Sequence, residues 1–244
     1  MSVIYQKDTY LNDTKRHYCP GCSHGLAHKL VGQVLEELQL VEKTITVGSV
    51  GCSGLFYDYS NSDCIMALHG RAPAVAAGVK AVHPDKIVYT YQGDGDLASI
   101  GIGETVSAAA RGENLTVIFA NNSVFGMTGG QMAPTTIPGE KTSTCRDGRE
   151  PQVHGYPIGV CELLSQLQGA RYVARASLHD VPHILEAKKM IRKAFTYQLE
   201  GRGYAFVELL CACPTNLRMK PTEACRWVEE EMTKVYPLGV FKEE

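Results

Sequence analysis

The sequence predicts an α/β fold in which helices cover both faces of a mostly parallel sheet. Segments with helical spacing alternate along the chain with short segments that are continuously apolar. Such strands are typical of a sheet that is buried on both sides. The 244 residues show no internal repeat and no low-complexity segment, and they suffice to bury a sizeable core. We therefore expect a single domain over residues 1–244.

The expected elements follow one another in a regular order. Ser23 is placed to cap a first helix that extends to about Leu40, because apolar residues recur at helical spacing between them. The expected strands are 44–50, 86–92, 114–121, 170–177 and 203–214, the last of which continues into a cysteine-rich turn. The further expected helices are 72–82, 96–112, 156–169 and 182–200.

The segment from residue 122 to residue 156 does not fit this alternation. It has little periodicity and is rich in Gly, Pro, Thr and Ser. A loop of this length inside a compact domain is usually functional or disordered. It follows directly on the carboxyl end of an expected strand, which is where parallel sheets bind ligands.

Composition excludes several classes of protein. The net charge is −2 with both signs mixed, so we expect no nucleic-acid partner. No apolar run reaches the length of a membrane span, and residues 1–19 lack the apolar core of a signal peptide. We therefore expect a cytoplasmic protein, in which nine cysteines serve metal binding, catalysis or packing and not disulfides.

Gly93-Asp94-Gly95-Asp96 forms a turn between an expected strand and an expected helix. Glycines allow a close approach to a ligand, and the free N–H groups at a helix start suit a phosphate. A carboxylate beside a phosphate requires a cation between them, so Asp94 indicates Mg²⁺ or Ca²⁺ bridging to a diphosphate. The stretch lacks the residues of a Walker A loop, a GxGxxG turn or an EF-hand. We expect the turn to be accessible to solvent, and two simply solvated aspartates remain the alternative.

The next expected strand ends in Asn121-Asn122, with 25 residues between Gly95 and Asn121. One helix and one strand in that interval return the chain to the same edge of the sheet, on the neighbouring strand. Asn122 can then offer its side-chain oxygen to the ion that Asp94 holds.

Five cysteines fall near expected turns at the same sheet edge. They are Cys19 and Cys22 in a CPGC stretch, Cys52 after one strand, and Cys211 and Cys213 after the last strand. A zinc site usually has two close cysteine or histidine pairs, and a redox dithiol needs no distant cysteine. A four-cysteine [4Fe–4S] site fits the count, and the zinc and dithiol alternatives remain open from spacing alone.

The motifs CPGC, GCS, HGR, GDGD, NN and a late cysteine before Pro-Thr-Asn occur in that order. GDGD followed by NN resembles the motif of thiamine diphosphate enzymes. The whole series resembles the β subunit of 2-oxoacid:ferredoxin oxidoreductases, from about residue 18 to residue 219. The resemblance implies the thiamine diphosphate-binding fold, with Mg²⁺ held by Asp94, Asn122 and the backbone carbonyl of Val124.

The same resemblance implies the remaining site residues. A [4Fe–4S] cluster is expected on Cys19, Cys22, Cys52 and Cys213, with Cys211 as the alternative fourth ligand. Cys64, Cys145, Cys161 and Cys225 are expected to be packing or surface thiols. His69 and Arg71 are the candidate catalytic residues, and the residues expected to contact the cofactor are Gly51, Ser53, His69, Gly70, Gly93, Asp94, Gly95, Asp96, Asn122, Gly126, Met127 and Thr128.

The family resemblance implies oxidative decarboxylation of a 2-oxo acid to an acyl-coenzyme A, with electrons passed through the cluster to ferredoxin. Thiamine enzymes also need a glutamate from a pyrimidine-binding domain, which is not expected in this chain. We therefore expect an α subunit that supplies that domain, together with γ and ferredoxin-like δ subunits. The rival classes are a thiamine enzyme of the acetolactate synthase type and a zinc-stabilised binding module.

A branched-chain substrate such as 2-oxoisovalerate is expected from residues 51–65. This segment contains no Lys or Arg, whereas relatives that act on 2-oxoglutarate often have Lys where Leu55 stands. A second substrate carboxylate needs a cation when it is buried. Arg71 is the nearest candidate cation, so 2-oxoglutarate and pyruvate remain alternative substrates.

Overall fold

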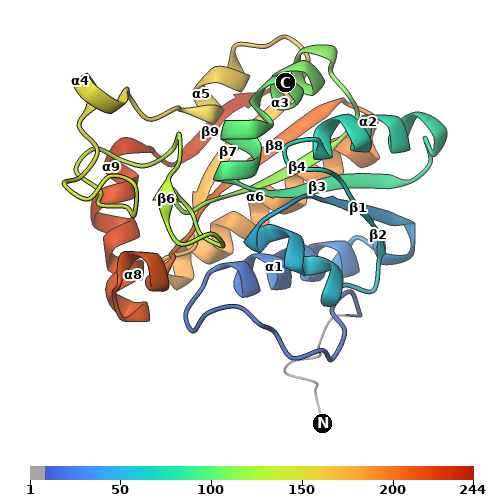
Figure 1. The fold of residues 1–244 in the computed structure, drawn as a ribbon. Coiled ribbons are helices and arrows are strands. Elements are labelled where there is room, and N and C mark those ends of the chain that lie inside the picture. The colour runs from blue at the N-terminus through green and yellow to red at the C-terminus, as the bar shows by residue number, and fades with distance from the viewer. Residues whose placement is uncertain (1–8) are drawn as a thin grey trace.

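The computed structural model describes residues 9–244 and shows a seven-stranded sheet between two layers of helices (Figure 1). The strand order is β2-β1-β3-β4-β8-β7-β9, and every neighbouring pair is parallel except β7 and β9. The strands are β1 (Thr44–Gly48), β2 (Asp63–Met66), β3 (Ile87–Gly93), β4 (Thr116–Asn121), β7 (Ala170–Ser177), β8 (Tyr204–Leu210) and β9 (Gly239–Glu243).

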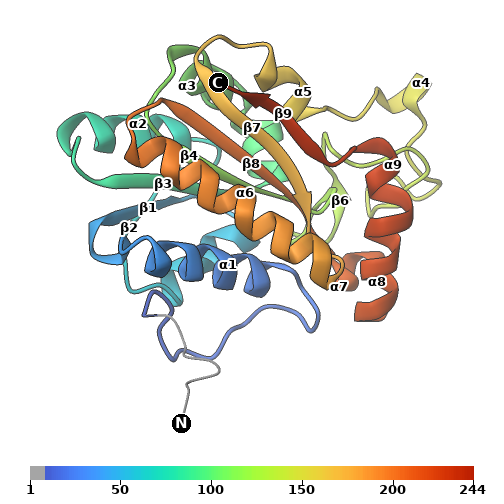
Figure 2. The same ribbon diagram turned by 180° about the vertical axis from the view of Figure 1, so that it is seen from behind.

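Helices cover both faces, as expected. Figure 2 shows α1 and α6 side by side on one face, and their apolar residues share a core with that side of the sheet. Helices α2, α3 and α5 cover the other face around a second core (Figure 1). The helices are α1 (His24–Glu37), α2 (Ala72–Val82), α3 (Ile102–Arg111), α4 (Pro151–His154), α5 (Val160–Ser165), α6 (Val181–Leu199), α7 (Pro214–Leu217), α8 (Pro221–Trp227) and α9 (Thr233–Val235).

The remaining elements are short. A 3₁₀ turn (Val41–Lys43) leads into β1 and another (Cys52–Asp58) follows it, while π-helical turns cover Gly95–Ile100 and Val228–Met232. The segment 122–156 contains only α4 and the hairpin of β5 (Val124–Phe125) and β6 (Gln131–Met132). Its expected lack of regular structure is therefore largely confirmed.

Of two expectations about local structure, one is confirmed in part and one is wrong. Ser23 is the N-cap residue of α1, but its side chain makes no capping hydrogen bond, and its hydroxyl oxygen accepts a hydrogen bond from the backbone N–H of Ala212 at 2.9 Å. The helix expected over 96–112 is interrupted at Gly101. A Cβ atom at Gly101 would lie 2.4 Å from the carbonyl oxygen of Gly70, so the close contact of these two loops sets the break.

Strands β2 and β9 and the helices after residue 214 were not expected. The C-terminal helices enclose a third, small core and contact the N-terminal cysteine loop, where a Cβ at Gly21 would lie 2.4 Å from Pro221. Over residues 9–244, no helix is long and apolar enough to cross a membrane. The expected absence of a signal peptide concerns residues 1–8 in part, which lie outside the described residues.

Candidate cofactor site

The carboxyl ends of four adjacent strands converge on one site. In sheet order, β1 leads to Cys52, β3 to Asp94, β4 to Asn122 and β8 to Cys213. The register pairs Gly93 with Ala120, so the glycine–aspartate turn and the asparagine pair lie on neighbouring strands. The expected return of the chain to the adjacent strand is confirmed.

Asp94 is buried at this edge, with 2% of its surface exposed. Its Oδ1 accepts a hydrogen bond from the N–H of Gly95 at 2.8 Å, and its Oδ2 accepts one from Thr135 Oγ1 at 2.9 Å. The expectation of a solvent-accessible turn is therefore wrong. Thr135 belongs to the long segment after β4, and this segment covers the carboxylate.

Burial raises the pKa of Asp94 to about 7, against the opposing effect of its two hydrogen bonds. A carboxylate in such a position is unfavourable unless a cation compensates its charge. Asn122 is 7% exposed, and its Oδ1 lies 3.3 Å from the N–H of Val124, so the three expected magnesium ligands are close together. These oxygens fit a divalent cation, which prefers carboxylate, amide and carbonyl ligands.

A cavity of about 120 Å³ adjoins Asp94 and Asn122. Its lining includes the expected residues Gly51, Ser53, His69, Gly93, Asp94, Gly95, Asp96, Asn122, Val124, Gly126, Met127 and Thr128. Ser53 is 1% exposed, and its hydroxyl has no hydrogen-bond partner in the described structure. A buried hydroxyl of this kind suits an oxygen of a bound diphosphate.

Glycines shape two walls of this cavity. Gly51 has a φ of +117°, which a residue with a side chain rarely adopts, and it turns the chain from β1 into the Cys52 segment. A Cβ at Gly95 would lie 2.3 Å from the ring of Phe125. Gly95 therefore allows the loop after β4 to close over the turn after β3.

Asp96 lines the cavity, but both oxygens of its carboxylate already accept hydrogen bonds from other protein groups. Its Oδ1 accepts hydrogen bonds from Ser49 Oγ at 2.7 Å, His69 Nδ1 at 2.5 Å and the N–H of Gly70 at 2.7 Å. Its Oδ2 accepts one from Gln92 Nε2 at 2.6 Å. Because Asp96 engages Nδ1, only Nε2 of His69 remains for a ligand, and Asp96 thus fixes the orientation of the imidazole ring.

Three expected residues do not line the cavity. Gly70 contributes its N–H to Asp96 instead. Arg71 forms an ion pair with Glu104 of α3. Leu55, from which the substrate was predicted, packs against the core beneath α1 and α6. The cavity lining contains no Lys and no Arg.

The four cysteines expected to bind a cluster gather beside this cavity. Burial, together with the smaller effect of the neighbouring thiols of the set, raises the pKa of Cys22 to about 12 and that of Cys52 to about 11. Among the described residues, no three cysteines have sulfurs within 4.8 Å of one another.

Cys211 and Cys213 have different surroundings. Cys211 is 2% exposed and belongs to the core beneath α1 and α6. Cys213 is partly exposed, and its Sγ accepts a hydrogen bond from Asn216 Nδ2 at 3.2 Å. These surroundings favour Cys213 as the fourth ligand. Of the other cysteines, Cys145 and Cys161 are buried, and Cys64 and Cys225 are partly exposed.

Gly126 lies where the cysteines and the cavity meet. A Cβ atom at Gly126 would be 3.6 Å from the sulfur of Cys52 and 3.6 Å from Asn122 Nδ2. One candidate cluster ligand and one candidate magnesium ligand are thus separated by little more than a glycine. Any groups held by the two sets of ligands would be close neighbours.

A cluster of aromatic and histidine rings beneath the site was not foreseen. The ring of Tyr18 stacks on those of His24 and His28, and its hydroxyl donates to the carbonyl oxygen of Cys52 at 3.1 Å. His24 lines the cavity, and Nδ1 is 2.6 Å from the hydroxyl of Tyr91. Burial lowers the pKa of His24 to about 4. The spacing of the two histidines, four residues apart on the apolar side of α1, was the available signal.

Glu140 lies behind the site and allows a test of the covering segment. It is 7% exposed, it accepts hydrogen bonds from Ser123 Oγ and the N–H of Ile137, and burial raises its pKa from 4.5 to about 8. Between pH 4.5 and pH 8 the folded protein therefore keeps a proton on Glu140 that the unfolded chain has lost. The free energy of unfolding falls as the pH rises through this range.

We expect Glu140→Gln to match the wild type in free energy of unfolding near pH 4.5 and to be the more stable protein at pH 8. The difference should grow by at most about 1.4 kcal/mol per pH unit. Urea denaturation of cofactor-free protein at several pH values measures it. Glu150→Gln, at an exposed position, should show no such trend. If the difference in free energy of unfolding between Glu140→Gln and the wild type did not depend on pH, the raised pKa of Glu140 would be contradicted.

Comparison with known proteins adds independent information. Residues 49–209 match the family model described as "Thiamine pyrophosphate enzyme, C-terminal TPP binding domain". The chain is 49% identical over 230 residues to ketoisovalerate oxidoreductase subunit VorA of Methanothermobacter thermautotrophicus, which covers 94% of this chain and 48% of that protein. The chain thus spans about half the length of this relative.

Other relatives match over most of their length. A 2-oxoglutarate synthase subunit KorB of Archaeoglobus fulgidus is 32% identical, over 93% of this chain and 84% of that protein. Among solved structures, the 2-oxoglutarate:ferredoxin oxidoreductase from Magnetococcus marinus, with 2-oxoglutarate, coenzyme A and succinyl-CoA bound, superposes with a TM-score of 0.77 at 26% identity. The match covers 96% of this chain and 84% of that one.

Proposed function

Because the chain belongs to the 2-oxoacid:ferredoxin oxidoreductase family and contains its thiamine diphosphate-binding domain, we propose that it is the β-type subunit of such an enzyme. The reaction is the oxidative decarboxylation of a 2-oxo acid to an acyl-coenzyme A. The observation that carries this proposal is the contact zone at Gly126, where Cys52 and Asn122 approach each other. In this proposal, a site for four thiolates lies next to a site for a metal-bound diphosphate.

Each candidate group has residues in this chain to hold it. Mg²⁺ is held by Asp94, Asn122 and the carbonyl of Val124, and Ser53 donates its unpartnered hydroxyl to the diphosphate. The cluster ligands are Cys19, Cys22, Cys52 and Cys213. Thiamine diphosphate supplies the electron-accepting carbon chemistry of decarboxylation, and a [4Fe–4S] cluster accepts electrons singly for transfer to ferredoxin.

His69 orients the bound cofactor or substrate through Nε2. Asp96 holds the ring by Nδ1 and is itself held by Ser49, Gln92 and Gly70, so the position of Nε2 is fixed before any ligand arrives. Fixed groups of this kind lose little entropy on binding. Arg71 is not proposed to contact the cofactor or the substrate, because it pairs with Glu104 and is not among the residues that line the cavity.

The chain acts together with partner subunits. Its relatives are named as subunits of larger enzymes. An α subunit is proposed to supply the pyrimidine-binding domain and its glutamate. Subunits γ and δ and free ferredoxin complete the electron path. A cytoplasmic location is proposed, because cysteines that bind a cluster must stay reduced.

A branched-chain 2-oxo acid is the proposed substrate. The cavity lining in this chain contains no Lys or Arg to pair with a second substrate carboxylate, and the relative at 49% identity is named for ketoisovalerate. We expect kcat/KM of the assembled complex to be highest for 2-oxoisovalerate, lower for pyruvate and lowest for 2-oxoglutarate.

Steady-state ferredoxin reduction with each of the three acids tests this order. A preference for 2-oxoglutarate would contradict the substrate assignment and would place the required cation on a partner subunit. Absence of activity with all three acids would contradict the proposed reaction itself.

A further inference from the structure

Two histidines and an aspartate that the proposed function does not use lie together at the start of α6. His179 follows β7, Asp180 is the N-cap residue of α6, and His183 lies in the first turn of that helix. Each offers a possible ligand atom, and these atoms all lie within 4.8 Å of one another. Imidazole nitrogens and a carboxylate oxygen are typical ligands of a divalent transition-metal ion. The three side chains therefore have the chemistry of a metal site.

One imidazole nitrogen of His179 lacks a partner although the side chain is only 2% exposed. Nδ1 lies 2.7 Å from Ser177 Oγ, whereas Nε2 is buried and has no hydrogen-bond partner in the part of the chain that the structure describes. Nε2 faces the carboxylate of Asp180, whose Oδ2 is 3.5 Å away. Buried polar atoms are nearly always satisfied, so this nitrogen indicates a ligand between the ring and the carboxylate.

Hydrogen bonds and ring contacts fix the orientation of the three side chains. Ser177, which contacts Nδ1 of His179, is itself fully buried. Asp180 Oδ1 accepts the backbone N–H of His183 at 2.9 Å and lies 2.6 Å from Nδ1 of the same residue. The ring centroids of His179 and His183 are 4.2 Å apart. Outer contacts such as that of Ser177 are typical of histidines that bind a metal ion through their other nitrogen.

His179 also lines a cavity of about 390 Å³ between the start of α6 and the C-terminal helices. Figure 2 shows the start of α6 beside α8, which contributes Cys225 and the exposed Arg226 to the lining, and Glu229 follows in the next turn. Gly21 of the CPGC stretch completes this part of the wall. An ion held at His179 is thus reached from solvent and has room for a water molecule as a further ligand.

We propose that His179, Asp180 and His183 bind a Zn²⁺ ion at the carboxyl end of β7. The ion links the end of this strand to the first turn of α6, and its remaining coordination position faces the cavity that α8 borders. Two nitrogen ligands favour Zn²⁺ over Mg²⁺ and Ca²⁺, which prefer oxygen ligands. The three residues are distinct from the candidate ligands of Mg²⁺ and of the cluster, and the proposed reaction does not require this ion.

Calorimetric titration of the chelator-treated complex with Zn²⁺ in excess Mg²⁺ tests the site, with His179→Gln and His183→Gln as the variants. His183 is 41% exposed, so its substitution should leave the packing of α6 intact. We expect the wild type to bind one Zn²⁺ per chain more than either variant. Affinity at this site should fall by more than about a hundredfold in both, because even the outer partners of metal ligands contribute about 10–100-fold.

His83→Gln is the matched control, since His83 is an exposed histidine at the end of α2, and it should bind Zn²⁺ as the wild type does. Cys225→Ser should also keep the ion, because Cys225 borders the cavity without belonging to the ligand set. The melting temperature should rise with Zn²⁺ in the wild type and not through this site in His183→Gln. Equal Zn²⁺ binding by the wild type and both histidine variants would overturn the proposal, as would loss of the ion in Cys225→Ser alone.

Discussion

Asp94→Asn is expected to abolish Mg²⁺-dependent binding of thiamine diphosphate and to lower turnover by about a thousandfold, or roughly 4 kcal/mol in transition-state stabilisation. Asp94 is the one carboxylate among the proposed ion ligands, and the amide that replaces it carries no charge to hold Mg²⁺ between protein and diphosphate. The change conserves shape, so the hydrogen bonds with Gly95 and Thr135 can persist.

The same variant should fold without difficulty. Burial raises the pKa of Asp94 to about 7, so removing the ionisable group relieves a cost that the cofactor-free wild type bears near neutral pH. Its melting temperature without Mg²⁺ should equal or exceed that of the wild type. Asp85→Asn, at an exposed turn, serves as the control and should bind the cofactor normally. Calorimetric titration of the complex with thiamine diphosphate and Mg²⁺ measures this binding. Wild-type affinity in Asp94→Asn would contradict the proposal that Asp94 is a magnesium ligand.

Cys213→Ala is expected to lower the iron content of the complex by the iron of one cluster and to stop electron transfer to ferredoxin. Cys213 lies in the turn beyond β8, within electrostatic reach of Cys22 and Cys52, and Asn216 donates to its sulfur. A hydrogen bond to the sulfur is typical of cysteines that bind iron–sulfur clusters.

Cys211→Ala is the matched variant, and we expect it to keep its iron. Cys211 packs in the core beneath α1 and α6, so its loss should lower the free energy of unfolding by about 1 kcal/mol through a small cavity. Iron and acid-labile sulfide are measured in anaerobically purified complexes. Equal iron in Cys213→Ala and the wild type, or iron loss in Cys211→Ala alone, would reverse the assignment.

Much of the fold was predictable because the sheet is parallel and buried. Apolar strands such as 170–177 were found with correct bounds, and the interval between Gly95 and Asn121 indicated neighbouring strands. β9 was not predictable, because it is a partly polar edge strand, antiparallel to β7. The break at Gly101 was missed for a related reason, since it depends on a contact with Gly70 from a distant loop.

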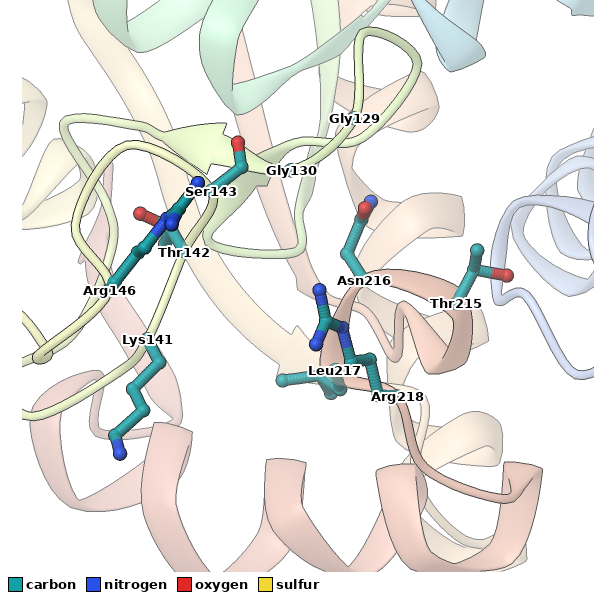
Figure 3. Close-up of a pocket in the computed structure, with 10 residues that line it drawn as sticks. All are labelled: Gly129, Gly130, Lys141, Thr142, Ser143, Arg146, Thr215, Asn216, Leu217 and Arg218. Atoms are coloured by element: carbon teal, nitrogen blue, oxygen red, sulfur yellow. The ribbon is translucent and has the colours of Figure 1, made fainter.

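In the candidate site, too, some features could be predicted from the local sequence, whereas others depend on contacts between distant segments. The order of the motifs predicted that Asp94, Asn122 and Cys52 meet at one edge of the sheet, and these three residues line one cavity. The burial of Asp94 could not, because it depends on Thr135, 41 residues away, in a segment without periodicity. A cavity of about 810 Å³ that Lys141, Arg146 and Arg218 help to line (Figure 3) was also missed, since these residues come together only through the packing of the C-terminal turn against the long loop.

The most direct test of the central claim is rapid anaerobic mixing of the complex with 2-oxoisovalerate, without coenzyme A or ferredoxin, while the visible absorption of the iron–sulfur cluster is followed. Wild-type complex should show reduction of the cluster by the substrate. Asp94→Asn should contain the same iron and show no reduction, because the cluster then lacks its electron source. Absence of a cluster in the wild type, or reduction that does not depend on Asp94, would contradict the proposal that a diphosphate cofactor and a cluster meet at Gly126.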